Sequence, residues 1–144
     1  MYRSLFIALL LAFPAVATAQ SNTASPAAVT VDSAGWLAIG GVSIIQLRDK
    51  SVCNSLSDRS SRIMSRMVNA LEKIHKKGRF HDINVAVLPP RPGEPSGEPW
   101  IAVEGELVMK VTFEDAAAND QKPDKLAAAY AEQFRKALRR IYTP

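Results

Sequence analysis

Two segments far apart in this chain repeat apolar residues every three or four positions. Residues 57–77 carry such a stripe at Ile63, Met67, Ala70, Leu71 and Ile74, and residues 123–142 at Leu126, Ala127, Tyr130, Phe134, Ala137, Leu138 and Ile141. This spacing places the apolar side chains on one face of an α-helix. Each helix must bury that face against another layer, which restricts the chain to layered folds with a shared core.

The residues at the ends of both segments support the two helices. Ser55 or Ser57 could accept a hydrogen bond at the first N-terminus, and Gly78 can adopt the left-handed conformation that ends a helix. Pro123 suits the first turn of the second helix because its missing N–H has no partner there.

The rest of the chain predicts strands and loops. Four segments rich in β-branched and apolar residues are predicted strands, namely 36–48, 83–88, 100–104 and 107–113. Residues 89–99 hold five prolines and two glycines, so they predict a stiff exposed loop, and 114–122 predict a connector. The expected fold is α+β in the order β-α-β-β-β-α, with about four strands in one sheet and both helices on one of its faces.

The N-terminus has the parts of a secretory leader. Arg3 precedes a short apolar run, and Pro14 and the sequence Ala17-Thr18-Ala19 follow it. The run is shorter than the roughly 20 residues that span a bilayer. We therefore expect a signal peptide at 1–19, cleaved near Gln20, a flexible tether at 20–35 and a single domain at 36–144. The expected location is the periplasm or the exterior, with no transmembrane segment in the mature chain.

Charge and motifs narrow the functional classes. The formal net charge is +4, a mild excess that fits anionic envelope surfaces better than nucleic acid. The sequence has no phosphate-binding glycine loop, G-x-S-x-G elbow or H-E-x-x-H motif, so it predicts neither a catalytic residue nor a cofactor. Cys53 is the one cysteine, which leaves a half-buried thiol, an intermolecular disulfide or a reactive thiol as alternatives.

The two histidines lie close together in the sequence. His75, His81 and the adjacent Asp82 could be imagined as metal ligands, but their spacing lacks the compact pattern of zinc motifs. Two solvent-facing histidines in a basic segment explain the same residues, and no metal is predicted. The neighbouring cations Lys73, Lys76, Lys77 and Arg79 fit either an anionic surface or solvation of a helix end.

Three arginines form the most informative polar feature. Arg59, Arg62 and Arg66 follow the spacing i, i+3, i+7 and so share one face of the first helix. Three interpretations remain open: a solvated stripe, an internal ion pair of Arg59 with Asp115, or a docking face for an acidic partner. Trp100, at the end of the proline-rich loop, is either a core residue or part of a recognition surface.

Several stretches together resemble a known bacterial domain. They are GVSIIQLR at 41–48, SDRS at 57–60, WIAVEGELVMKVT at 100–112 and DAAAN at 115–119. They are similar to the extracytoplasmic N-terminal domain of some channels of the small-conductance mechanosensitive class, which also occurs in stand-alone secreted proteins of unknown function. The resemblance covers residues 36–142.

The resemblance implies roles for few residues. It matches Arg59 and Asp115 to a recurrent arginine and aspartate whose role is structural or unassigned, and it brings no catalytic residue. Ser60 departs from the pattern, which tends to have alanine there. No channel segment follows the domain, so we expect a stand-alone module.

These observations favour a non-enzymatic binding or accessory module of the cell envelope. Its partner would be a membrane protein, a wall polymer or a second copy of the chain. One alternative is a small extracytoplasmic hydrolase or metal-dependent enzyme that uses His75, His81 and Asp82. The other alternative is a binder of anionic surfaces that uses both helix ends, with an affinity that falls steeply with salt.

Overall fold

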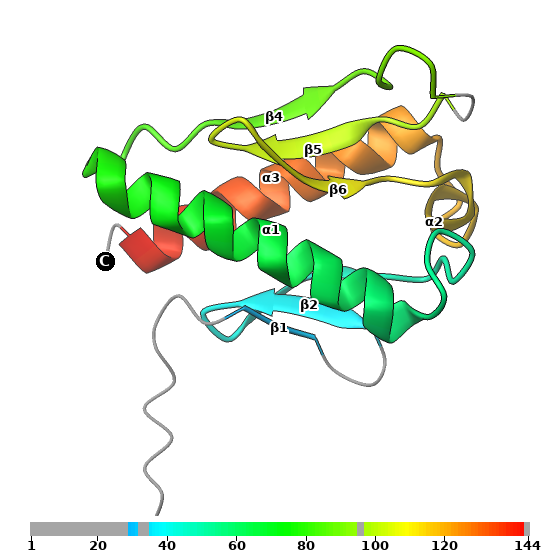
Figure 1. Ribbon diagram of the computed structural model, residues 1–144, viewed down its shortest axis with the longest axis horizontal. Coiled ribbons are helices and arrows are strands. Elements are labelled where there is room, and N and C mark those ends of the chain that lie inside the picture. The colour runs from blue at the N-terminus through cyan, green and yellow to red at the C-terminus, as the bar shows by residue number, and fades with distance from the viewer. Residues whose placement is uncertain (1–28, 32–34, 95–96, 143–144) are drawn as a thin grey trace, which may run out of the picture.

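Two long helices and two antiparallel sheets enclose the core of the domain (Figure 1). The computed structural model describes residues 29–31, 35–94 and 97–142. The helices are α1 (Leu56–Lys77), α2 (Phe113–Ala117) and α3 (Pro123–Tyr142). The first sheet contains β1 (Val29–Val31), β2 (Trp36–Ile39) and β3 (Val42–Gln46), and the second contains β4 (Val85–Leu88), β5 (Trp100–Val103) and β6 (Glu106–Lys110). The α+β class is therefore confirmed.

The first sheet corrects two expectations. Residues 36–48 were expected to form one strand, but Gly40 and Gly41 both have positive φ and reverse the chain, so β2 and β3 pair as a hairpin. β1 lies inside the segment expected to be a tether, and its Val29 pairs with Ile39 of β2. Pairing with β2 satisfies backbone groups of this short segment, which its composition alone does not reveal.

The second sheet follows the sequence pattern more closely. β4, β5 and β6 form an antiparallel meander in which Val85 pairs with Val103 and Trp100 with Lys110. β6 ends at Lys110, three residues before the predicted end, because Thr112 caps a short helix that the sequence did not predict. The Thr112 hydroxyl accepts a hydrogen bond of 3.1 Å from the backbone N–H of Asp115.

The helices lie between the sheets, so the expected arrangement of both helices on one face of a four-stranded sheet is wrong (Figure 1). α1 contacts β6 of one sheet and β1 of the other, while α3 contacts β3, β4 and β5. Each long helix thus connects the edge strands of the two sheets. Apolar residues from both sheets and both helices, including Leu37, Ile101, Met67 and Phe134, form one core cluster.

The predicted helices are confirmed in detail. The Ser55 hydroxyl accepts a hydrogen bond of 3.1 Å from the backbone N–H of Asp58, and Gly78 ends α1 with φ of 65°. Every residue of the predicted stripe on α1 is buried, and so is the stripe on α3 apart from its last member, the half-buried Ile141. Apolar spacing therefore identified the helix faces that pack against the sheets.

Membrane-spanning helices are not found in the described ranges, since none of their helices combines the length and the apolar character that crossing a bilayer requires. The predicted leader at 1–19 lies outside the described residues, and so does most of the predicted tether at 20–35.

Candidate functional site

A buried ion pair joins Arg59 of α1 to Asp115 of α2. The side chains are 4% and 1% exposed, and the guanidinium group contacts both carboxylate oxygens. Nη1 donates to Oδ1 at 3.0 Å, and Nη2 donates to Oδ2. This two-pronged contact is the geometry in which arginine binds a carboxylate most strongly. The pair considered from the sequence is thus present in the structure.

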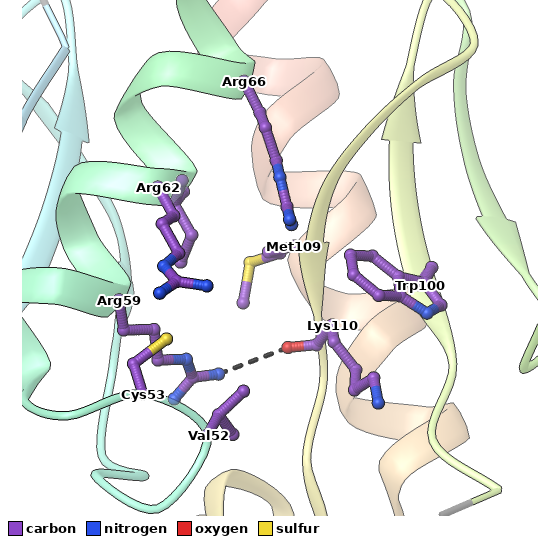
Figure 2. Close-up of a pocket in the computed structure, with 9 residues that line it drawn as sticks. Val52, Cys53, Arg59, Arg62, Arg66, Trp100, Met109 and Lys110 are labelled. Atoms are coloured by element: carbon purple, nitrogen blue, oxygen red, sulfur yellow. Dashed lines mark hydrogen bonds between the residues drawn. The ribbon is translucent and has the colours of Figure 1, made fainter. Parts of the chain in front are cut away.

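The ion pair also holds three backbone segments together. Arg59 donates to the carbonyl oxygens of Asp49, at 3.0 Å, and Lys110, at 3.2 Å. Figure 2 shows the bond to Lys110 at the end of β6. Asp115 accepts hydrogen bonds of 3.0 Å from the backbone N–H groups of Arg48 and Asp49. The segment before α1, the end of β6 and the start of α2 therefore meet at one charged contact.

The electrostatics of this cluster favour an ionised Asp115. Burial raises the pKa of this carboxyl, but the hydrogen bonds and the charge of Arg59 outweigh burial and hold the pKa below its usual range. Burial also raises the pKa of Asp49, but the hydrogen bonds from Ser51 and Thr112 and the charge of Arg59 together lower this pKa below its usual value. The nearby charge of Asp49 raises the pKa of the exposed Glu114.

Beside the ion pair, a hollow opens between α1 and the second sheet. Its volume is about 160 Å³, and we call it the arginine pocket. Its lining residues come from α1, the segment before it, β5 and β6, and they are Val52, Cys53, Arg59, Arg62, Ile63, Arg66, Trp100, Met109 and Lys110. Figure 2 shows the side chains of Arg62 and Arg66 reaching from α1 into the space opposite Met109.

The three arginines of α1 differ in their partners. Arg59 is neutralised by Asp115, and Arg62 forms an exposed pair with Asp58 at 3.2 Å. The guanidinium carbon of Arg66 lies 5.3 Å from the ring centre of Trp100, a cation–π contact. Within the described part of the chain, no carboxylate forms an ion pair with Arg66.

Trp100 forms a wall of the pocket and is 7% exposed. Its indole N–H donates to Glu94 at 3.0 Å, which attaches the proline-rich loop to the sheet. Arg91 and Lys110 also lie within 6 Å of the ring centre, at 4.9 and 5.7 Å. Lys110 in turn pairs with Glu94 and Glu98. Trp100 thus packs among the side chains of Arg66, Arg91 and Lys110 and does not project from the loop.

The other sequence candidates lie elsewhere. His75 packs edge-on against Phe80 and Tyr142, while Nε2 of the exposed His81 lies 3.5 Å from the carboxylate of Asp82. No three potential metal ligands come together among the residues that the structure describes. Two of the basic residues near the end of α1 are engaged with the β5–β6 turn, because Lys73 pairs with Glu106 and Lys77 with Glu104.

The sequence analysis did not identify two residues that complete the site. Asp49 falls between the predicted strand at 36–48 and the predicted helix at 57–77, yet it is buried and its backbone binds both members of the ion pair. Lys110 lies opposite Trp100 in the register of β5 and β6. The alternating pattern of β5 and β6 and the short turn between them indicate that Trp100 and Lys110 face each other. They do not indicate that α1 packs across this pair.

We expect Asp115→Asn to destabilise the protein by about 3 kcal/mol at neutral pH, because it leaves the buried charge of Arg59 without its counter-ion. The folded-state pKa of Asp115 is depressed, so its contribution is complete above the unfolded value of about 3.9 and is lost as the pH falls below that value. Urea unfolding between neutral pH and pH 3 should therefore show a shallower acid loss in Asp115→Asn than in the wild type.

The matched control is Asp58→Asn, which removes the exposed partner of Arg62. It should cost about 1 kcal/mol or less, because exposed ion pairs contribute little. Equal effects of the two substitutions at neutral pH would contradict a structural role for the buried pair.

Comparison with known proteins gives a family and no established activity. No curated protein and no solved structure matches the chain significantly. One family model, described as a domain of unknown function (DUF8459), matches residues 36–141. These residues include every member of the ion pair and of the arginine pocket. The chain therefore belongs to the DUF8459 family, a domain of unknown function.

Proposed function

We propose that this chain is a non-enzymatic binding module that works outside the cytoplasm. Its binding surface is the arginine pocket, and its partner is an acidic protein of the cell envelope. The observation that carries this proposal is the placement of Arg66, an uncompensated cation among the described residues, at a hollow with apolar walls. A binding site of this kind attracts an acidic group and orients it at the same time.

The ion pair supports the proposal because it fixes both sides of the pocket. Arg59 lies in the same helix as Arg62 and Arg66, and it is bonded to the backbone of Lys110 on the facing strand. The distance between α1 and β6 is thereby set by a buried contact. A pocket whose walls are fixed in advance loses less entropy when a partner binds.

The proposed location outside the cytoplasm rests on sequence. The pattern at residues 1–19 is that of a secretory leader. The resemblance to extracytoplasmic domains of small-conductance mechanosensitive channels points to the same compartment and to a partner in the envelope membrane.

A photo-crosslinking amino acid at Val52 tests the proposed surface, because Val52 is exposed and lines the pocket. In the native envelope, we expect this variant to capture one specific protein, and the same amino acid at the exposed Lys125 of α3 not to capture it. Arg66→Glu should abolish the capture by charge repulsion, whereas Arg139→Glu, an equal charge change on another surface, should preserve it. Capture that is equal at both positions, or unaffected by Arg66→Glu, would refute the proposal.

A second candidate function has support from a different part of the molecule. The rings of Phe80 and Tyr142 stack at 4.9 Å, and His75 packs edge-on against both, so the C-terminal ends of α1 and α3 meet. This end of the molecule carries exposed basic side chains from both helices and from the segment after α1, namely Lys76, Arg79, Arg139 and Arg140. Such a cluster would suit an anionic lipid surface.

Sedimentation with vesicles tests this second function. The lipid-surface function predicts binding to vesicles with 30% phosphatidylglycerol. This binding should fall steeply between about 0.05 and 0.3 M salt, because salt screens the charges. The double variant Arg139→Gln/Arg140→Gln should bind much less. The variant Arg62→Gln/Arg66→Gln is the matched control and should bind as the wild type does. Salt-independent binding, or equal losses in both double variants, would exclude the helix ends as the lipid contact.

A further inference from the structure

We infer that the arginine pocket is a subsite for a single carboxylate on a short apolar arm, and that an Asp or Glu side chain of an acidic peptide segment occupies it. This inference rests on the proposed function and adds the chemical class of the group that is bound. It follows from the charge, the lining and the size of the pocket.

The charge of the pocket matches one negative charge. Four cations line it, namely Arg59, Arg62, Arg66 and Lys110, and a fifth, Arg91, lies against the ring of Trp100. Four carboxylates face them: Asp115 pairs with Arg59, Asp58 with Arg62, and both Glu94 and Glu98 with Lys110, so one positive charge is in excess. Of the four lining cations, Arg66 is the one without an ion-pair partner among the described residues. A carboxylate would neutralise this one charge, whereas a phosphate group brings a charge of about −1.5 to −2 and would leave an excess.

The lining favours an anion that carries methylene groups. Val52, Ile63, Met109 and the ring of Trp100 supply apolar surface beside the guanidinium groups. An inorganic ion would leave this surface in contact with water, but the carbon atoms of an Asp or Glu side chain would cover it. The volume of about 160 Å³ also lies below the roughly 300–1,000 Å³ of pockets that hold drug-sized ligands, so a single side chain is the appropriate scale.

Trp100 prepares Arg66 for this contact. The ring lies 5.3 Å from the guanidinium carbon and limits the positions that the long arginine side chain can adopt. The indole N–H is already bonded to Glu94, which fixes the ring. Arginine can stack on an aromatic ring and still present N–H donors to a carboxylate in a bidentate contact, which lysine cannot do.

Titration with propionate, a carboxylate on a two-carbon apolar arm, tests the inference on the ¹⁵N-labelled chain. At constant ionic strength, we expect saturable shifts of the Arg66 Nε–H and Trp100 indole N–H signals in nuclear magnetic resonance spectra. Propionamide has the same shape without the charge and should cause no saturable shift. Inorganic phosphate should bind more weakly than propionate at the same pH.

Two variants locate the site. Arg66→Gln should weaken propionate binding at least tenfold, as followed at the Trp100 signal, because it removes the uncompensated charge. Arg139→Gln changes the net charge equally and should leave the affinity unchanged. Unaltered backbone amide signals outside the pocket would show that each variant is folded.

Several outcomes would overturn the inference. They are the absence of saturable propionate binding, equal binding of propionamide, tighter binding of phosphate, and equal losses in the two variants. The proposed function fails separately, through the crosslinking experiment at Val52. Specific capture at Val52 without propionate binding would preserve the binding module and refute the carboxylate subsite, and the reverse result would preserve the subsite and refute the protein partner.

Discussion

The bonds between Arg59 and Asp115 are the contact on which the candidate site depends. Taking both charges out of water is costly, and their attraction offsets that cost only where further hydrogen bonds satisfy the remaining donors and acceptors. Here the backbone of Arg48, Asp49 and Lys110 supplies those bonds. The charged contact therefore specifies how α1, β6 and α2 meet, which apolar packing alone would specify less sharply. The same arrangement sets the positions of α1 and β6, which are two walls of the neighbouring arginine pocket.

The three arginines on one face of α1 have different environments. Arg59 is buried and stabilises the arrangement, while Arg62 and Arg66 lie successively farther along α1 and border a hollow. This difference follows from the position of each residue relative to the end of β6, because Arg59 is the one of the three arginines that reaches the carboxylate of Asp115 in α2. The cation–π contact between Trp100 and Arg66 then joins the second sheet to the same face of α1. One regular spacing of arginines thus produces a buried structural contact at Arg59 and pocket-lining side chains at Arg62 and Arg66.

Local sequence patterns predicted the helices well and the sheets only in part. The stripes on α1 and α3 follow from apolar spacing, and Gly78 and Ser55 act at the ends of α1 as their chemistry indicates. The division into two sheets depended on Gly40 and Gly41, which reverse the chain where one continuous strand was expected. β1 depends on pairing with β2 and has little signal of its own. The arginine stripe was visible in the sequence, but its three different environments were not, because tertiary contacts decide which arginine meets Asp115.

A double-mutant cycle between Arg59 and Asp115 tests the central claim most directly. The free energies of unfolding of Arg59→Met, Asp115→Asn and the double variant would be measured against the wild type at neutral pH. If the buried pair organises this part of the fold, each single variant leaves a buried polar group without its partner, and the coupling energy between the two sites should be at least about 2 kcal/mol. If the loss of the double variant equals the sum of the two single losses to within about 0.5 kcal/mol, the two residues act independently. That result would contradict an organising role of the buried pair.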